Sequence, residues 1–355
     1  MREDVTIVVT AVTCSVVVLA GEPAVIRLLR RAAVIDTPNG RSSHSVPTPR
    51  GGGAPIAAVL AVSSLVAFGA SALPFVMAVG AFAVVGLADD LRGLRASTRL
   101  VLQAGISCVV AVLLVWPAVG SWPPGSPQLG PAEIGLPWPA TVVILIAAGP
   151  AIVVWITGFV NAFNFMDGIN GISAGHAIVA GGAYAVLGAL EHDTFITGAG
   201  AAIAASGLAF LPWNAFRARV FLGDVGSYAL GAGLAVLAID AVLHGVTLEA
   251  AVAPLAVYLA DTFWTLQRRI RAGEPWRDAH RTHAYQRLCD AGWSHQQVTV
   301  LACGVSAVVS ALGIASMTGD ARLRIAADVL ALGCVALYLS APALAGREFR
   351  RTETA

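Results

Sequence analysis

Long apolar runs alternate with short polar segments along almost the whole chain. Most runs are close to twenty residues long, the length an α-helix needs to cross a hydrocarbon core of about 30 Å. The pattern predicts about eleven transmembrane helices, near residues 5–28, 51–70, 72–88, 99–117, 139–158, 171–190, 194–212, 225–243, 247–266, 297–317 and 325–345. We therefore expect an all-α, polytopic integral membrane protein with a single membrane-embedded domain over residues 1–355.

Composition agrees with this pattern. Hydrophobic residues make up 57% of the 355 positions and charged residues only 12%, with a mean hydropathy of +0.76. An ordinary soluble domain has about 25% charged residues, so that class is excluded. The five cysteines are scattered without a CxxC spacing, and we expect them to be small core residues with no disulfide or metal role.

Basic residues predict the orientation in the membrane. All 22 basic residues are arginines. With the N-terminus outside, only Arg2, Arg322 and Arg324 would face outside, and the rest would face the cytoplasm. Because cytoplasmic loops carry an excess of basic residues, the N-terminus is predicted outside and the C-terminus inside.

The polar clusters able to support chemistry all fall in connections that this orientation places in the cytoplasm. These loops lie near residues 29–50, 89–98, 159–170, 213–224 and 267–296. The clusters are DTPNGRSSHSVPTPRGGG (36–53), GLADDLRG (86–93), NAFNFMDGING (161–171), FLGDVGS (221–227) and RRIRAGEPWRDAHRTHAYQRL (268–288). Carboxylates near membrane depth are costly and usually functional. Five clusters on one face therefore predict one site at the inner membrane boundary.

Four aspartates in these clusters suit a hard cation: Asp89, Asp90, Asp167 and Asp224. Their carboxylate oxygens are the ligands that Mg²⁺ prefers, together with substrate phosphates. Asp224 follows a glycine at the start of a predicted helix, where a ligand can approach the backbone and the helix N-terminus favours phosphate. The adjacent Asp89 and Asp90 could instead form a solvated helix end.

Polar side chains near these aspartates could bind a substrate. Asn164 and Asn170 can donate hydrogen bonds to phosphate or base oxygens, although asparagine is also common in ordinary turns. His280 and His283 would share a helix face, but no third ligand has a spacing suited to zinc. They are better explained as donors to a pyrophosphate beside neighbouring arginines, some of which simply reflect the positive-inside rule.

Familiar phosphate-binding motifs are absent from the sequence. The segment RGGGAP cannot be a Walker P-loop, because the chain has no lysine, and no GxGxxG follows a strand. The predicted site must therefore bind phosphates through a metal ion, arginines and helix ends.

The five clusters, in this order, resemble those of the polyprenyl-phosphate N-acetylhexosamine-1-phosphate transferases, which form glycosyltransferase family 4. The resemblance covers residues 36–288. This family includes the phospho-MurNAc-pentapeptide translocase of peptidoglycan synthesis and the initiators of O-antigen, enterobacterial common antigen and teichoic acid synthesis. The resemblance implies an enzyme of ten or eleven transmembrane helices, dependent on Mg²⁺ or alternatively Mn²⁺.

The implied reaction moves a sugar 1-phosphate from a UDP-N-acetylhexosamine to undecaprenyl phosphate or another polyprenyl phosphate and releases UMP. It would start the synthesis of a lipid-linked surface polysaccharide. The resemblance places the protein in the bacterial inner membrane, in contact with membrane lipid, with a cytoplasmic active site. It allows a homodimer and gives nucleic acid no role.

The resemblance also implies roles for individual residues. Asp224 matches the metal ligand, and Asp89 matches an aspartate expected to act on the lipid phosphate and to assist with the metal. Asp90 and Asp167 are the other candidate catalytic residues. The expected substrate-binding residues are Arg41, His44, Arg50, Asn161, Asn164, Asn170, Arg277, His280, Arg281 and His283.

Two departures from the family pattern bear on the substrate. Ser42 stands where many relatives have a lysine, so a contact made by that lysine is in doubt here. The segment HRTHAYQ replaces the run of histidines typical of the peptidoglycan enzyme. This favours a simple UDP-N-acetylhexosamine over UDP-MurNAc-pentapeptide, which remains the alternative substrate.

Other interpretations stay open at this stage. A transporter or flippase for lipid-linked or phosphorylated solutes would also carry carboxylates in its helices. An inactive structural subunit of a polysaccharide assembly complex could not be distinguished from an enzyme by sequence. Asp261, within a predicted helix, could belong to the site or pair with an arginine. The lipid phosphate is already largely dianionic at neutral pH, so direct attack is favoured over a covalent aspartyl-phosphate on Asp89 or Asp90.

Overall fold

The computed structural model describes residues 2–38, 43, 45–115, 138–275 and 280–353. The predicted substrate-binding residues Arg41, His44 and Arg277 lie outside the described residues, as does Ser42. The long helices are α1 (Arg2–Arg31), α2 (Ala54–Phe68), α3 (Leu73–Arg92), α4 (Ala96–Val115), α5 (Trp138–Met166), α6 (Ile172–Leu190), α7 (Thr194–Asn214), α8 (Gly223–Leu243), α10 (Ala256–Arg271), α12 (His295–Thr318) and α13 (Ala321–Glu353). The short elements are helices α9 (Leu248–Val252) and α11 (Ala284–Asp290), the 3₁₀ turns η1 (Gly69–Ala72) and η3 (Ala253–Leu255), and the strands β1 (Ile35–Asp36) and β2 (Thr48–Pro49).

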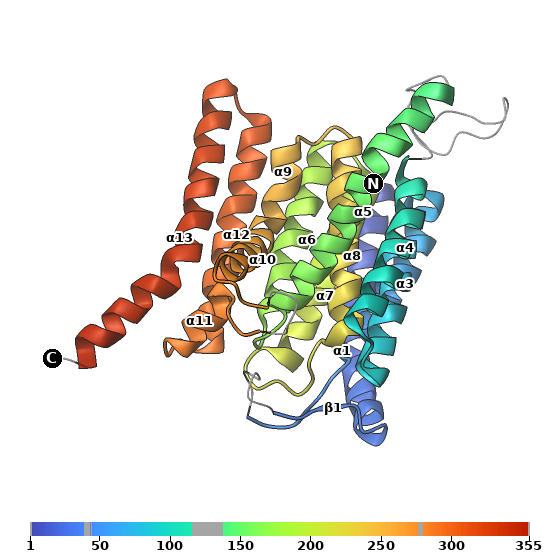
Figure 1. The fold of residues 1–355 in the computed structure, drawn as a ribbon. Helices are drawn as coiled ribbons and strands as arrows, with labels where there is room; N and C mark the ends of the chain where they lie inside the picture. Colours follow the sequence, from blue (N-terminus) through green and yellow to red (C-terminus); the bar gives the residue numbers. More distant parts are fainter. Residues whose placement is uncertain (1, 39–42, 44, 116–137, 276–279, 354–355) are drawn as a thin grey trace.

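The all-α, polytopic architecture is confirmed, with most long helices running side by side (Figure 1). Within the described residues, nine segments are long and apolar enough to cross a membrane. One of them, Ala54–Arg92, contains two of the predicted spans, because only η1 separates α2 from α3.

The predicted span at 247–266 is not a continuous transmembrane helix. It is divided into α9, η3 and α10. Pro254 lies in η3, where its missing N–H breaks the helical hydrogen-bond ladder. Because α10 also ends in Arg268, Arg269 and Arg271, it is amphipathic rather than uniformly apolar. Figure 1 shows α10 nearly end-on, crossing the direction of the neighbouring helices.

Helix α8 forms the centre of the bundle. Nearly all of its residues from Gly223 to Ala241 are buried, and α3, α5, α6 and α7 pack around it. Glycines permit the closest approaches at its N-terminus. A Cβ atom on Gly86 would collide with the carbonyl group of Asp224, and one on Gly53 would collide with Gly226. The N-terminus of α8 is therefore held directly against α3 and residues 51–53.

The polar clusters gather at one end of the bundle, the lower end in Figure 1. The strands β1 and β2 pair antiparallel there, with Asp36 opposite Thr48. The α5–α6 and α7–α8 connections and α11 lie at the same end. The alternating direction of the helices thus brings five segments distant in sequence to one place.

Candidate active site

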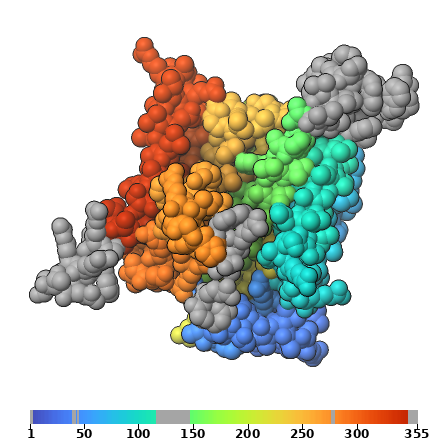
Figure 2. Space-filling view, in the orientation of Figure 1, coloured from blue at the N-terminus to red at the C-terminus, as the bar shows by residue number. Residues whose placement is uncertain are grey.

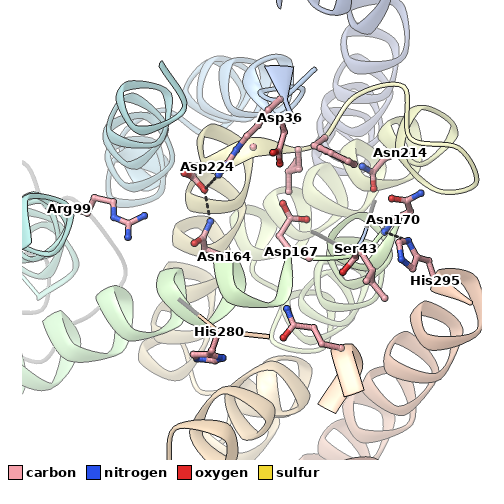
Figure 3. A pocket seen from close by; sticks show the side chains of 17 residues that line it. Asp36, Ser43, Arg99, Asn164, Asp167, Asn170, Asn214, Asp224, His280 and His295 are labelled. Atoms are coloured by element: carbon pink, nitrogen blue, oxygen red, sulfur yellow. Dashed lines mark hydrogen bonds and ion pairs between the residues drawn. The ribbon is translucent and has the colours of Figure 1, made fainter. Parts of the chain in front are cut away.

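A cavity of about 380 Å³ opens at this end of the bundle (Figure 3). Four of the five clusters contribute to its lining, and the GLADDLRG cluster (86–93) does not. The lining residues are Asp36, Ser43, Arg50, Arg99, Asn164, Asp167, Gly168, Ile169, Asn170, Asn214, Phe221, Leu222, Gly223, Asp224, His280, Gln286 and His295. Residues from four clusters that are distant in sequence therefore share one cavity.

Arg50 joins two aspartates at the edge of this cavity. Its Nε lies 2.8 Å from Oδ1 of Asp90, and its Nη2 lies 2.7 Å from Oδ1 of Asp224. Burial alone would lower the pKa of the Arg50 guanidinium, but the carboxylates of Asp224, Asp90 and Asp36 raise the pKa above its ordinary value. Arg50 therefore carries a positive charge held between carboxylates.

Asp90 orders the start of α8. Its Oδ1 accepts a hydrogen bond from the Asp224 N–H (2.9 Å), and its Oδ2 accepts one from the Val225 N–H (3.0 Å). A carboxylate here satisfies two of the free N–H groups at a helix N-terminus and complements the helix dipole. With the Arg50 contact added, Asp90 is fully engaged, and it does not line the cavity.

Asp224 faces the cavity from the first turn of α8. Gly223 precedes it with φ +75°, a left-handed conformation that favours glycine. Asn164 Nδ2 donates to Asp224 Oδ1 at 2.7 Å and lies 2.9 Å from Ser227 Oγ. Arg50 and Asn164 both contact Oδ1 of Asp224. They fix the orientation of the carboxylate but do not bind its Oδ2.

Asp89 is held by a different set of groups. Its Oδ1 accepts from the Leu94 N–H at 2.8 Å, and its Oδ2 accepts from Arg99 Nη1 (2.9 Å) and the Tyr228 hydroxyl (3.1 Å). Arg99, in turn, lines the cavity. Asp89 itself does not line the cavity, and it is connected to the lining by its ion pair with Arg99.

Asp167 lines the cavity from the connection between α5 and α6 (Figure 3). Burial raises the pKa of its carboxyl to about 6. The neighbouring Gly168 allows Tyr285 to pack closely, and the Tyr285 hydroxyl donates to the Phe165 carbonyl at 2.9 Å. This contact fixes the α5–α6 connection against α11.

The two histidines of the HRTH segment occupy different environments. His280 lines the cavity, and its Nδ1 lies 3.1 Å from Thr282 Oγ1. Burial, followed by the charges of His283 and nearby arginines, lowers the pKa of His280 to about 4. It is therefore neutral at physiological pH. His283 is buried, with its Nδ1 3.2 Å from Asp261 Oδ1.

Asp261 is an anchor for α11. The Ala284 N–H donates to its Oδ1 at 2.9 Å, and the Tyr338 hydroxyl donates to its Oδ2 at 3.0 Å. Thr265 Oγ1 adds a further contact at 3.2 Å. Asp261 thus pairs with polar groups around it and lies outside the cavity lining.

Two further predicted residues also lie outside the cavity lining. Asn161 donates to Gln103 Oε1 at 2.7 Å, which joins α5 to α4. Arg281 forms an ion pair with Asp290 at 3.0 Å. Of the described predicted residues, the cavity lining itself includes Arg50, Asn164, Asp167, Asn170, Asp224 and His280.

Sequence reasoning missed several lining residues, of which Arg99, Asn214 and His295 are the most informative. Asn214 accepts a hydrogen bond from the Gly171 N–H at 2.7 Å and donates to the Val220 carbonyl at 3.1 Å, so it links the α5–α6 and α7–α8 connections. His295 Nδ1 lies 3.4 Å from the Asn170 N–H. Each of the three lies near an end of a helix on the predicted cytoplasmic side, a position that could have identified it.

The cavity contains donors that fit a magnesium ion. Asp224 and Asp167 both offer carboxylate oxygens to the same space. Within the described residues, no three His, Cys, Asp or Glu side chains are grouped closely enough to hold a metal alone. Mg²⁺ commonly binds through one or two carboxylates and completes its shell with phosphate oxygens and water. This donor set therefore fits Mg²⁺ bound together with a phosphorylated ligand.

Six of the labelled side chains form two groups on opposite sides of the cavity (Figure 3). Arg99, Asn164 and Asp224 lie on one side, and Asn170, Asn214 and His295 lie on the other. Arginines and a bound cation would attract phosphates to the first side. The amide and imidazole groups of the second side can hydrogen-bond to a neutral polar group. A ligand with a diphosphate and a neutral polar part fits this division.

Comparison with known proteins finds a matching family model and several relatives. A family model described as "Glycosyl transferase family 4" matches residues 72–242. A Bacillus subtilis protein named as a probable undecaprenyl-phosphate N-acetylglucosaminyl 1-phosphate transferase is 29% identical over 321 residues, covering 88% of this chain and 86% of that protein. The decaprenyl-phosphate N-acetylglucosaminephosphotransferase of Mycobacterium leprae is 31% identical over 309 residues, covering 77% and 74%. The phospho-N-acetylmuramoyl-pentapeptide-transferase of Leuconostoc citreum is 30% identical over 257 residues, covering 67% and 73%.

Proposed function

The chain belongs to glycosyl transferase family 4, and we propose that it transfers an N-acetylhexosamine 1-phosphate from a UDP-sugar to polyprenyl phosphate and releases UMP. The observation that carries the proposal is the cavity in which Asp167, Asp224, Arg50 and Arg99 surround one space. We place the protein in the bacterial inner membrane, with this cavity open to the cytoplasm, where UDP-sugars are available.

The arginines suit the charge of the two substrates. A UDP-sugar carries a diphosphate, and a lipid monophosphate is largely dianionic at neutral pH because its second pKa is about 6. Bringing these anions together requires positive charge and in-line positioning. Arg50 and Arg99 both line the cavity and can contact phosphate oxygens. Neutral His280 can add a hydrogen bond without changing the charge.

A bound Mg²⁺ would supply further neutralisation of the diphosphate and the leaving UMP. Asp224 would hold it, with Asp167 as the second carboxylate in the cavity. Asn164 would orient Asp224 through its 2.7 Å hydrogen bond.

Direct attack is the reaction course that the side chains favour. An oxygen of the lipid phosphate forms a bond to the phosphorus that carries the sugar, and the bond from this phosphorus to the oxygen of UMP breaks. A covalent route would need a free carboxylate as nucleophile. Asp90 is engaged by two backbone N–H groups and Arg50, and Asp89 by Leu94, Arg99 and Tyr228. These contacts support a positioning role for both residues.

Among the candidate sugars, we propose UDP-N-acetylglucosamine or a related UDP-N-acetylhexosamine. The HRTHAYQ segment lacks the run of histidines typical of the peptidoglycan enzyme. The relative that matches 88% of this chain is named for N-acetylglucosaminyl 1-phosphate transfer. UDP-MurNAc-pentapeptide is the second candidate, since the Leuconostoc relative is named for that activity.

A transfer assay with purified protein tests the proposal. The protein is incubated in detergent with Mg²⁺, undecaprenyl phosphate and a panel of radiolabelled UDP-sugars, and both labelled lipid and UMP are measured. We expect label in the lipid from a UDP-N-acetylhexosamine and an equal amount of UMP. Transfer from UDP-MurNAc-pentapeptide alone would replace the proposed substrate. Absence of lipid-dependent UMP release with every donor would contradict the proposed reaction.

A further inference from the structure

Arg50 occupies the position of a counter-cation in the proposed metal site. We propose that its guanidinium neutralises Asp90 and Asp224 in the metal-free protein, and that a divalent cation displaces it from Asp224 toward the substrate diphosphate. This exchange rests on the proposed function, because it assumes that Asp224 holds the cation. It makes Arg50 both a competitor of the metal and a phosphate-binding group that metal binding releases.

Because Asp90 and Asp224 are buried, their carboxylates need a positive partner when no metal ion is bound. The side chains of Asp90 and Asp224 are only 1% and 8% exposed. Two buried carboxylates without a positive partner are strongly unfavourable. Arg50 contacts one oxygen of each at 2.8 and 2.7 Å. A planar guanidinium with several N–H donors is suited to such a bridge.

The two ends of this bridge differ. Asp90 already accepts hydrogen bonds from two backbone N–H groups of α8. These bonds hold its carboxylate in place, so we expect its contact with Arg50 to remain. Asp224 faces the cavity and is held by Asn164, which can retain its contact when Arg50 leaves. The Arg50–Asp224 contact is therefore the one that a cation entering the cavity would replace.

The backbone around Arg50 is fixed, so the exchange involves its side chain. The Phe221 N–H donates to the Pro49 carbonyl at 2.8 Å, and the Gly52 N–H donates to the Phe221 carbonyl at 2.9 Å. The Gly53 N–H donates to the Leu222 carbonyl at 2.8 Å. In contrast, the Arg50 side chain is 37% exposed and lines the cavity. A change of side-chain rotamer can thus move the guanidinium while its Cα stays in place.

The exchange predicts that Arg50 weakens metal binding in the absence of substrate. A positive charge a few ångströms from a cation opposes its binding, and the opposition is large where water is partly excluded. Substitution by glutamine removes the charge and keeps a similar side-chain length. We expect Arg50→Gln to bind a divalent cation at least about tenfold more tightly than wild type.

Binding of Mn²⁺ alone to metal-stripped protein tests this expectation. Free Mn²⁺ is followed by electron paramagnetic resonance for wild type, Arg50→Gln and the matched control Arg27→Gln. Arg27 is an exposed arginine on α1 whose Nε donates to the Pro23 carbonyl. Tighter binding by Arg50→Gln only, with Arg27→Gln equal to wild type, supports the exchange. Equal or weaker binding by Arg50→Gln overturns it.

A second measurement uses wild-type protein and does not depend on the folding of the variant. Phenylglyoxal modifies accessible arginines, and peptide mapping by mass spectrometry reports the rate at Arg50. We expect several-fold faster modification at Arg50 with Mn²⁺ than with EDTA, and an unchanged rate at Arg27. A rate at Arg50 that falls or stays constant with Mn²⁺ overturns the exchange.

The outcomes separate this inference from the proposed function. If wild type releases UMP but Arg50 does not compete with Mn²⁺, the transferase function stands and the exchange fails. If no protein binds Mn²⁺, the exchange fails because there is no cation site, and the transfer assay decides the function independently.

Discussion

The carboxylate of Asp90 accepts a hydrogen bond from the backbone N–H of Asp224 at 2.9 Å. This contact links α3 to the first turn of α8, the central helix of the bundle. Residue 90 therefore sets the position of the backbone that carries the proposed metal ligand. In the view of Figure 2, other helices cover most of α8, in agreement with the burial of nearly all its residues.

Asp90→Asn tests this positioning role. The amide would present an NH₂ group to a backbone N–H or to Arg50, so one contact becomes repulsive. We expect the free energy of unfolding to fall by about 2–4 kcal/mol, the range for breaking a buried charged network. Thermal unfolding in detergent measures the change. Asp290→Asn, at an exposed ion pair with Arg281, should change stability by less than about 1 kcal/mol. Equal effects of the two substitutions would contradict the positioning role.

The carboxyl of Asp167 gives a pH-dependent prediction. Its pKa is raised from 3.8 to about 6 by burial. A raised pKa in the folded state means that ionisation disfavours folding, so stability falls as pH rises from about 4 to about 6 and the cost persists above that range. Asp167→Asn removes this cost. We expect the metal-free variant to be more stable than wild type by about 3 kcal/mol at pH 7.5, with a much smaller difference near pH 4.

Stability and turnover should move in opposite directions for this variant. If the ionised carboxylate contacts the metal or substrate, Asp167→Asn should lose transfer activity at pH 7.5 while it gains stability. Thermal unfolding at both pH values, with UMP release at pH 7.5, gives the comparison. A stability difference that is the same at both pH values would show that burial does not perturb the Asp167 carboxyl.

Asp261 should be important for the structure around His280. It receives hydrogen bonds from α11, α10 and α13 through Ala284, Thr265 and Tyr338. Asp261→Asn should lower the free energy of unfolding by about 3 kcal/mol, since it weakens a fully buried charged network. Glu274→Gln provides the control, because the Glu274 side chain is 46% exposed in its ion pair with Arg269. Chemical denaturation that gives equal values for both would contradict the anchoring role.

The orientation in the membrane can be tested by cysteine labelling. In a cysteine-free background, Ala218→Cys lies in the α7–α8 connection and Thr318→Cys lies at the end of α12. A membrane-impermeant maleimide applied from outside should label Thr318→Cys in intact cells and label Ala218→Cys only after permeabilisation. The reverse pattern would place the cavity outside and contradict the predicted orientation.

The sequence predicted the helical architecture well, because apolar runs of about twenty residues leave few alternatives in a membrane. It also predicted that the polar clusters meet, since alternating helices return them to one end. It could not predict the break at Pro254, because the run from 247 to 266 remains apolar enough to resemble a span.

The roles of individual aspartates depend on geometry that the sequence does not contain. Asp89 and Asp90 are adjacent, yet one contacts Arg99 and Tyr228 and the other contacts Arg50 and the start of α8. A helix turns by about 100° per residue, so neighbours on it face different partners. Arg99 was missed because it lies outside the five clusters, although its place near the predicted cytoplasmic end of α4 was a signal.

The measurement that most directly tests the central claim is a Mg²⁺ titration of UMP release by wild type, Asp224→Asn and Asp4→Asn. Asp4 is exposed in the first turn of α1, so its variant should match wild type. Asp224→Asn removes the charge from the proposed metal ligand, and losing about 4 kcal/mol of transition-state stabilisation would slow turnover by roughly 10³-fold. We predict that loss, with a higher Mg²⁺ midpoint, for monodisperse protein at equal concentration. Turnover above about a tenth of wild type with an unchanged midpoint would contradict the assignment of the metal to Asp224.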